Sequence, residues 1–167
     1  MRVFVQIPCL NEEKTLPLAL ESIPREIPGV DSVEILVVDD GSTDATVAVA
    51  RAYGVVQFVQ HAGNEGLARS FRDGVTYALE HGADIVVNTD GDNQYPQEEI
   101  PNLVRPIIDG QADIVIADRQ TSKIAHFSPF KKTMQNVGSH VVNMAAGSTY
   151  PMQRLASGHI PKNLYTV

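Results

Sequence analysis

The chain of 167 residues is 43% hydrophobic and 20% charged, which is typical of a globular domain with a sizeable core. No apolar run approaches the roughly 20 residues of a membrane-spanning helix, and Gln6 and Pro8 speak against a secretory signal peptide at the start. The single cysteine, Cys9, excludes an intramolecular disulfide and fits a reducing compartment, while the net charge of −7 and the lack of a basic-aromatic pattern give no indication of nucleic-acid binding.

Hydrophobic patterns and turn residues predict that strands and helices alternate up to about residue 118. The expected strands are 2–8, 33–40, 55–59, 84–90 and 114–117. The expected helices are 16–23, 45–53, 67–81 and 97–109. This alternation predicts an α/β fold with an open, mostly parallel sheet and helices on both of its faces.

Short polar residues and glycines mark the ends of the expected helices. Thr15 suits the N-cap of the first helix, the turn 41–44 caps the second, and Gly82 closes the third. Cys9 is interpreted as a small residue at a strand end rather than as a catalytic thiol. The third helix is expected to face the sheet with an apolar stripe. This stripe consists of Leu67, Phe71, Val75 and Leu79.

The last part of the chain differs from the rest in charge. All twenty Asp and Glu residues lie between Glu12 and Asp118, whereas six Lys and Arg residues and no acidic residue lie from Arg119 onward. Such asymmetry indicates either a surface that faces an anionic partner or a solvated basic face. In this part we expect a helix over 131–146.

Polar clusters occur at the carboxyl ends of four predicted strands. Ligands of open parallel sheets bind at this edge. The clusters are Pro8 with Asn11 and Glu12, Asp39 with Asp40, Asp90 with Asp92, and Asp118 with Arg119. Four such clusters at one edge indicate a binding site rather than turn chemistry alone.

The sequence Asp90-Gly91-Asp92 gives the most specific chemical signal. Alternate residues of an extended chain point the same way, so both carboxylates are expected on one side, and Gly91 allows close approach of a ligand. Oxygen ligands favour Mg²⁺, Mn²⁺ or Ca²⁺, and Mg²⁺ commonly shares phosphate oxygens with its substrate, which predicts a metal-diphosphate site. Ordinary turn chemistry is the alternative. A calcium hand is excluded because its sixth and twelfth positions would be Tyr95 and Pro101.

Four segments resemble, in order, the motifs of family 2 glycosyltransferases, most closely the branch of dolichol-phosphate mannosyltransferases and polyprenyl-phosphate glycosyltransferases. They are 7–13 (IPCLNEE), 37–44 (VVDDGSTD), 64–68 (NEGLA) and 90–96 (DGDNQYP). The resemblance covers roughly residues 1–143 and implies the GT-A fold, an α/β domain that binds nucleotide-diphosphate sugars. It implies a single catalytic domain over 1–167, with a nucleotide-sugar-binding core over 1–118 and a basic acceptor-side tail over 119–167. Since the tail does not match the family beyond about Gly147, a truncated catalytic domain is one interpretation.

The resemblance also implies roles for individual residues. Asp92 and Arg119 would be catalytic, because they lie where the family stabilises the leaving diphosphate. Mg²⁺ or Mn²⁺ would be the cofactor, bound by Asp90, Asp92 and Gln94. Leu10 departs from the family's usual tyrosine or phenylalanine, so base stacking at this position stays open. Contacts with the nucleotide sugar are implied for Pro8, Leu10, Asn11, Glu12, Val37, Asp39, Asp40, Asp90, Gly91, Asp92 and Arg119.

The implied reaction is inverting transfer of a sugar from a donor of the GDP-mannose or UDP-glucose type. A hydroxyl acceptor needs a general base, but no carboxylate follows Asp118, whereas a phosphate acceptor is already ionised. With the basic tail, this favours a polyprenyl or dolichyl phosphate acceptor and a cytoplasmic protein in peripheral contact with the cytoplasmic membrane face. One alternative is transfer to a saccharide hydroxyl, with His126, His140 or His159 as the base. Another is a non-catalytic nucleotide-sugar-binding module.

Overall fold

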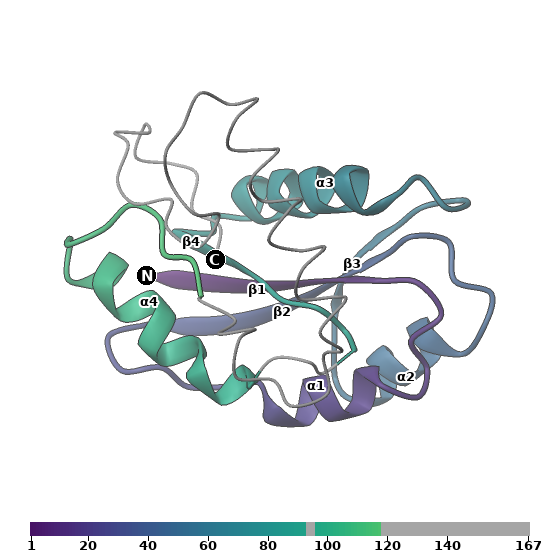
Figure 1. Cartoon of the computed structure of the whole chain (residues 1–167), viewed down its shortest axis with the longest axis horizontal. Coiled ribbons are helices and arrows are strands. Elements are labelled where there is room, and N and C mark those ends of the chain that lie inside the picture. The colour runs from purple at the N-terminus through teal and green to yellow at the C-terminus, as the bar shows by residue number, and fades with distance from the viewer. Residues whose placement is uncertain (93–95, 118–167) are drawn as a thin grey trace, which may run out of the picture. The chain divides into compact units, whose positions relative to one another are not determined.

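The computed structural model describes residues 1–92 and 96–117, and its elements belong to a compact unit that includes Met1–Val115 (Figure 1). The strands are β1 (Arg2–Cys9), β2 (Ser32–Asp39), β3 (Gln57–Gln60) and β4 (Ile85–Asn88). The helices are α1 (Leu16–Ser22), α2 (Thr46–Ala52), α3 (Leu67–Glu80) and α4 (Ile100–Ile108), with the 3-10 helix η1 (Gln97–Glu99) before α4. The predicted order of elements up to residue 109 is confirmed, with ends that differ by a few residues. None of the helices in the described ranges has the length and apolar character needed to cross a bilayer.

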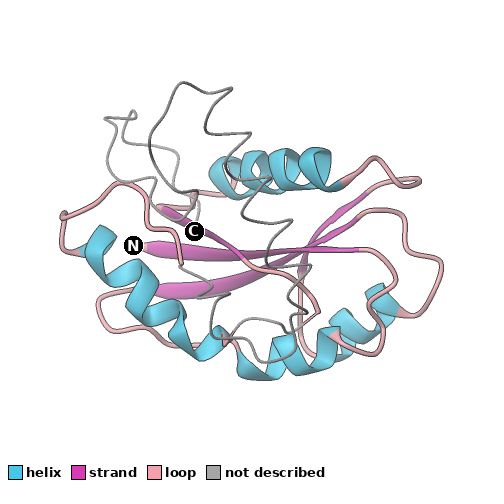
Figure 2. Cartoon of the chain, viewed as in Figure 1, coloured by secondary structure: helices cyan, strands magenta, loops and turns pink. Residues whose placement is uncertain are grey.

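The four strands form a parallel sheet in the order β3-β2-β1-β4 (Figure 2). β1 pairs with β2 along its full length and with β4 from Val3 to Gln6. The chain therefore moves outward from β1 in one direction to β2 and β3, and returns to the other side of β1 to add β4. Ligands of such sheets bind beyond the carboxyl ends of the strands at this switch point. The loops that follow β1 and β4 lie side by side there.

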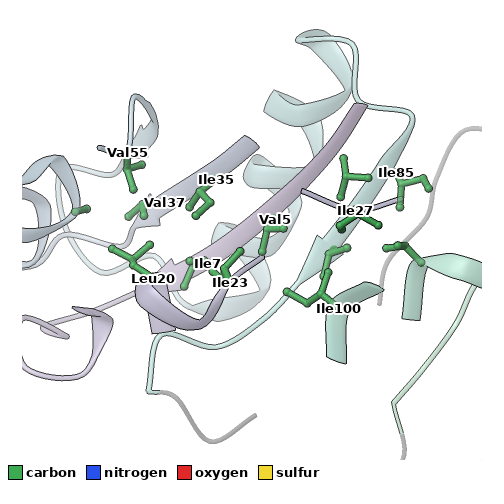
Figure 3. Packing of buried hydrophobic residues seen from close by; sticks show 14 of the residues in the cluster. Val5, Ile7, Leu20, Ile23, Ile27, Ile35, Val37, Val55, Ile85 and Ile100 are labelled. Atoms are coloured by element: carbon green, nitrogen blue, oxygen red, sulfur yellow. The ribbon is translucent and has the colours of Figure 1, made fainter. Parts of the chain in front are cut away.

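Side chains of the strands alternate between two covered faces, as expected for a buried parallel sheet. One face packs against α1, α2 and α4 and contains large aliphatic residues (Figure 3). Members of this cluster are Val5, Ile7, Leu20, Ile23, Ile27, Ile35, Val37, Val55, Ile85 and Ile100. The other face packs against α3 and has a smaller cluster: Phe4, Leu36, Val38, Val75, Ala78 and Val86. Figure 1 shows α3 opposite the three other helices.

The apolar stripe predicted for α3 is wrong at both of its ends. Leu67 and Leu79 are 66% and 37% exposed. A Cβ atom at Gly74 would lie 2.3 Å from Gln6 Oε1 and 2.7 Å from Val38 Cγ2, so the helix lies directly on the sheet. Only a very small residue fits at this position, while Phe71 and Val75 from the middle of the predicted stripe pack in the smaller apolar cluster as expected. The buried residues of α3 are Ser70, Gly74, Val75 and Ala78.

The strand predicted over 114–117 is not formed, since residues 112–117 have no regular secondary structure. The side chain of Val115 nevertheless packs against the larger apolar cluster. A β-branched run favours extended backbone, but a strand also needs a hydrogen-bonded neighbour, and β4 pairs with β1 alone among the described strands. The helix predicted over 131–146 lies outside the described residues.

Candidate functional site

A cavity of about 420 Å³ opens at the carboxyl-terminal edge of the sheet. Its walls come from the loops after β1 and β4, from the end of β2 and from the beginning of α3. The residues that line it are Pro8, Cys9, Leu10, Glu12, Asp40, Asn64, Gly66, Leu67, Ser70, Asp90, Gly91 and Asp92. Most of the predicted site residues are thus brought together. Asn11, Val37 and Asp39 do not line the cavity, and Gln94 and Arg119 lie outside the described residues.

Asn11 fastens the loop after β1 to the loop after β2. Its Oδ1 accepts a hydrogen bond from the Thr43 N–H at 2.8 Å, and its own N–H donates to Ser42 Oγ at 2.9 Å. Asn11 has a φ of 57°, in the left-handed region that asparagine tolerates better than most residues. The next residue continues the connection, because the Glu12 N–H donates to Thr46 Oγ1 at 2.8 Å. The side chain of Asn11 thus holds the loop in place, and its contact with a nucleotide stays a prediction.

Polar side chains at the beginnings of α1 and α2 also connect these loops. Asp44 Oδ1 accepts the Thr46 N–H at 2.9 Å, but the N-cap position of α2 is Ala45 and lies just after the turn 41–44 that was predicted to cap the helix. The other oxygen of Asp44 accepts the Glu13 N–H at 3.2 Å. Thr15 is at the N-cap position of α1 as predicted, but its hydroxyl donates to the Glu12 carboxylate instead of accepting a helix N–H. This bond orients the Glu12 carboxylate at the cavity wall.

Val37 and Asp39 serve the fold at the end of β2. The side chain of Val37 is fully buried in the larger apolar cluster, and the nucleotide contact predicted for this residue stays a prediction. The pleat of the strand turns this side chain toward the helices that cover the sheet. Asp39 is 4% exposed, and its Oδ1 accepts the Ser42 N–H at 3.0 Å, which closes the turn after the strand.

Asp40 holds the beginning of α3. Its carboxylate accepts hydrogen bonds from the backbone N–H groups of Glu65 at 2.8 Å and Gly66 at 2.9 Å, and its Oδ1 lies 2.8 Å from His61 Nδ1. Burial alone raises the pKa of the Asp40 carboxyl, but the hydrogen bonds from His61 and the two backbone amides outweigh it and lower the pKa below its ordinary value. Asp40 is therefore ionised at neutral pH and contributes negative charge to the cavity wall.

The loop after β4 packs tightly against the end of β1. A Cβ atom at Gly91 would lie 3.2 Å from Cys9 Sγ, so glycine permits the close packing of this loop on β1, and its contact with a ligand stays a prediction. Thr89 Oγ1 donates to Gln97 Oε1 at 2.8 Å, and this buried bond joins the two ends of the loop. Burial raises the pKa of the Cys9 thiol far above its usual range, with smaller contributions from nearby carboxylates, in agreement with its interpretation as an unreactive strand-end residue.

Asp90 and Asp92 have the donor chemistry that a hard divalent cation requires. Both carboxylates are half-buried at the wall of the open cavity. Within residues 1–92 and 96–117, no three His, Cys, Asp or Glu side chains converge on a common point as a complete metal site would require. Magnesium-type sites are usually completed by substrate phosphates and water around one or two carboxylates. The two aspartates therefore fit a cation that binds together with a phosphate ligand.

Sequence reasoning missed the contribution of α3 and of His61. The cavity is lined by Asn64, Leu67 and Ser70. The segment 64–68 was recognised from the sequence as a family motif, but no contact with a ligand was predicted for it. The signal for Ser70 was a small polar residue within an otherwise amphipathic helix. His61 gave no local signal, because its partners come from β2 and α3.

Comparisons with known proteins agree with this geometry. The model of the family Glycosyl transferase family 2 matches residues 4–153. An undecaprenyl-phosphate mannosyltransferase from Micrococcus luteus is 31% identical over 145 residues, which cover 83% of this chain and 58% of that protein. The chain spans little more than half the length of the curated relatives it matches.

Two solved structures show the same architecture. The mannosyltransferase PcManGT from Pyrobaculum calidifontis, in complex with GDP-Man and Mn²⁺, is 28% identical with a TM-score of 0.55, over 71% of this chain and 36% of that chain. Glucosyl-3-phosphoglycerate synthase from Mycobacterium tuberculosis, in complex with Mn²⁺, UDP-glucose and phosphoglyceric acid, is 32% identical with a TM-score of 0.53, over 66% of this chain and 40% of that chain. The predicted GT-A fold is confirmed.

Proposed function

The chain belongs to glycosyl transferase family 2, and on that basis we propose that its cavity binds a nucleotide-diphosphate sugar together with Mg²⁺ or Mn²⁺. The charge of the cavity carries this proposal. Four acidic side chains line it, and its described lining includes no Lys or Arg. Such a surface repels a diphosphate unless a divalent cation lies between them. The relatives solved with Mn²⁺ and GDP-Man or UDP-glucose support the same combination.

Individual residues have distinct roles in this proposal. Asp90 and Asp92 would hold the cation, with Gln94 as a further ligand. The bound cation would neutralise the charge that grows on the leaving diphosphate. Pro8, Glu12 and Asp39 would contact the base and ribose, and Arg119 would add a bidentate contact to a phosphate.

The proposed reaction is sugar transfer with inversion to a polyprenyl or dolichyl phosphate. An acceptor phosphate oxygen attacks the anomeric carbon from the face opposite the diphosphate. The new carbon–oxygen bond forms as the bond to the diphosphate breaks, and that bond's electron pair leaves with the nucleoside diphosphate. An ionised phosphate needs no general base. The likeness to an undecaprenyl-phosphate mannosyltransferase supports this acceptor class. The basic residues from Arg119 onward would favour peripheral contact with an anionic membrane surface on the cytoplasmic side.

A second candidate is transfer to a hydroxyl acceptor. The likeness to glucosyl-3-phosphoglycerate synthase, solved with phosphoglyceric acid, favours it. This reaction requires a general base near the acceptor, which distinguishes it chemically from transfer to a phosphate. Product analysis with a polyprenyl phosphate, phosphoglyceric acid and a soluble saccharide as parallel acceptors separates the two candidates. Metal-dependent donor binding without transfer to any acceptor would instead indicate a binding module.

The donor site is tested by calorimetric titration of GDP-mannose and UDP-glucose, first with Mn²⁺ and then with EDTA. We expect one nucleotide sugar to bind with Mn²⁺ and binding to be lost with EDTA. Asp92→Ala should abolish this binding, because it removes a cation ligand. The matched control is Glu98→Ala, since Glu98 is an exposed carboxylate beyond the loop after β4. Undiminished affinity in Asp92→Ala would contradict the site assignment, and no binding of either nucleotide by the folded wild type would contradict the proposed function.

A further inference from the structure

His61 lies between two carboxylates at the junction of β2, β3 and α3. Its side chain is 7% exposed, its Nδ1 is 2.8 Å from Asp40 Oδ1, and its Nε2 is 3.4 Å from Asp73 Oδ2. Its backbone is also fixed, because the His61 N–H donates to the Asp39 carbonyl at 2.9 Å. Burying a polar ring beside a charged carboxylate costs free energy. A ring kept in such a place therefore indicates a role in the fold or in the site.

The two carboxylates depend on His61 to different degrees. Asp73 also pairs with Arg69 at 2.9 Å and Arg72 at 3.1 Å, so its charge is compensated on the outer side of α3. Asp40 is within hydrogen-bond distance of His61 and interacts otherwise with neutral groups in the described residues, namely the Glu65 and Gly66 amides and the Ser70 hydroxyl, and not with Lys or Arg as Asp73 does. Loss of the ring should therefore affect Asp40 more than Asp73.

Asp40 connects His61 to the cavity wall through its hydrogen bonds. Its oxygens accept the N–H groups of Glu65 and Gly66, directly before α3 begins. The turn around Gly41 is in close contact with the same segment, since a Cβ atom at Gly41 would lie 2.6 Å from the Gly63 backbone. From this segment onward, α3 contributes part of the cavity wall.

We propose that His61 is a positioning residue, whose hydrogen bond to Asp40 fixes the beginning of α3 and thereby the cavity wall formed by Asn64, Gly66 and Ser70. Its effect on ligand binding rests on the proposed function. The ordering of α3 does not, because it can be measured in the protein without ligand.

Two substitutions distinguish the role of the Nδ1 contact with Asp40 from that of the Nε2 contact with Asp73. His61→Asn places its amide nitrogen near the position of Nδ1, facing Asp40, whereas His61→Gln places it near Nε2, facing Asp73. If His61 merely filled space, the larger glutamine would be the better replacement. Positioning through Asp40 predicts the opposite order. Asp73→Asn is the control for the outer side and should leave the segment before α3 unchanged.

The first readout is hydrogen exchange of the Glu65 and Gly66 amides in the free protein. We expect exchange about tenfold faster in His61→Gln and close to wild type in His61→Asn and Asp73→Asn, because a hydrogen bond to a charged group is lost only in the first. Amides of β1 in each variant report whether it is folded. Faster exchange in His61→Asn, or equal exchange in all variants, would overturn the proposal, even if His61→Gln failed to fold.

The second readout is calorimetric affinity for GDP-mannose and UDP-glucose with Mn²⁺. The nucleotide bound by wild type should bind roughly tenfold more weakly to His61→Gln and unchanged to His61→Asn. Altered exchange with unaltered affinity would overturn the link between α3 and the cavity. Absence of binding in wild type, with the expected exchange pattern, would contradict the proposed function but support the positioning role.

Discussion

The two faces of the sheet are built in different ways. The face covered by α1, α2 and α4 is filled by large aliphatic side chains that come from every strand except the short edge strand β3, whose Phe58 packs at its margin. The face covered by α3 combines a smaller apolar cluster with buried polar residues, Gln6 and Ser70, and with the close contact at Gly74. The first face reaches the cavity wall through Cys9, whereas the second reaches it through Ser70 and the beginning of α3.

This difference indicates a division of tasks. Large aliphatic side chains provide stability with little geometric precision, since volume-conserving changes there are tolerated. Small residues and hydrogen-bonded polar groups, such as Gln6 with its Nε2 on Asn88 Oδ1 at 3.0 Å, fix the distance between a helix and a sheet more exactly. We therefore expect damage to the first face to reduce stability alone, and damage to the second face to reduce stability and ligand affinity together.

The largest effect is expected for Leu20→Ala on the aliphatic face. Leu20 is 1% exposed, and its truncation should lower the free energy of unfolding by about 2–5 kcal/mol in urea denaturation, because it removes buried methyl groups and leaves a cavity. Leu18→Ala is the matched control on the same helix, with a side chain 52% exposed and an expected change within about 0.5 kcal/mol. Reduced nucleotide affinity in folded Leu20→Ala would contradict the expectation that damage to this face reduces stability alone.

A smaller effect is expected for Gly74→Ala on the α3 face. Overpacking costs about 1–3 kcal/mol and the better helix propensity of alanine recovers about 1 kcal/mol, so the net loss should be about 0–2 kcal/mol. Nucleotide affinity should also fall, because α3 must move away from Gln6. Thr76→Ala, at an exposed position of α3, should change neither quantity. A more stable Gly74→Ala would mean that α3 can shift without cost.

The smallest effect is expected for Asp40→Asn in acid. The pKa of Asp40 is lowered in the folded state, so its ionised form contributes stability above the unfolded pKa of about 3.9, and this contribution disappears as the pH falls below that value. The difference in melting temperature between wild type and Asp40→Asn should therefore shrink as the pH falls from about 5 to 2. Glu98→Gln provides the control for an exposed carboxylate. A difference that is constant with pH would exclude this role of the Asp40 charge.

The local pattern of residues in the sequence was sufficient to predict the order of the elements up to α4. It also predicted that polar residues gather at one edge of the sheet. The short apolar runs of β1 and β2 and the turn residues after each strand are short-range signals, and parallel pairing brings the strand ends together. Pro8, Glu12, Asp40, Asp90 and Asp92 could therefore be predicted to lie near one another. Residues 114–117 show the limit of this reasoning, because an extended pattern does not supply a pairing partner.

The sequence by itself determined the fold class, the edge that carries the site and the oxygen-rich chemistry after β4. Tertiary structure decided which polar residues support the site and which line it. Asn11 is held by the loop after β2, and Gly74 rather than Leu67 lies against the sheet. The physical reason is that hydrogen-bond partners and the spacing between layers are set by residues far apart in the chain. His61, placed between the carboxylate directly after β2 and that of Asp73 in α3, becomes recognisable only once those elements have packed.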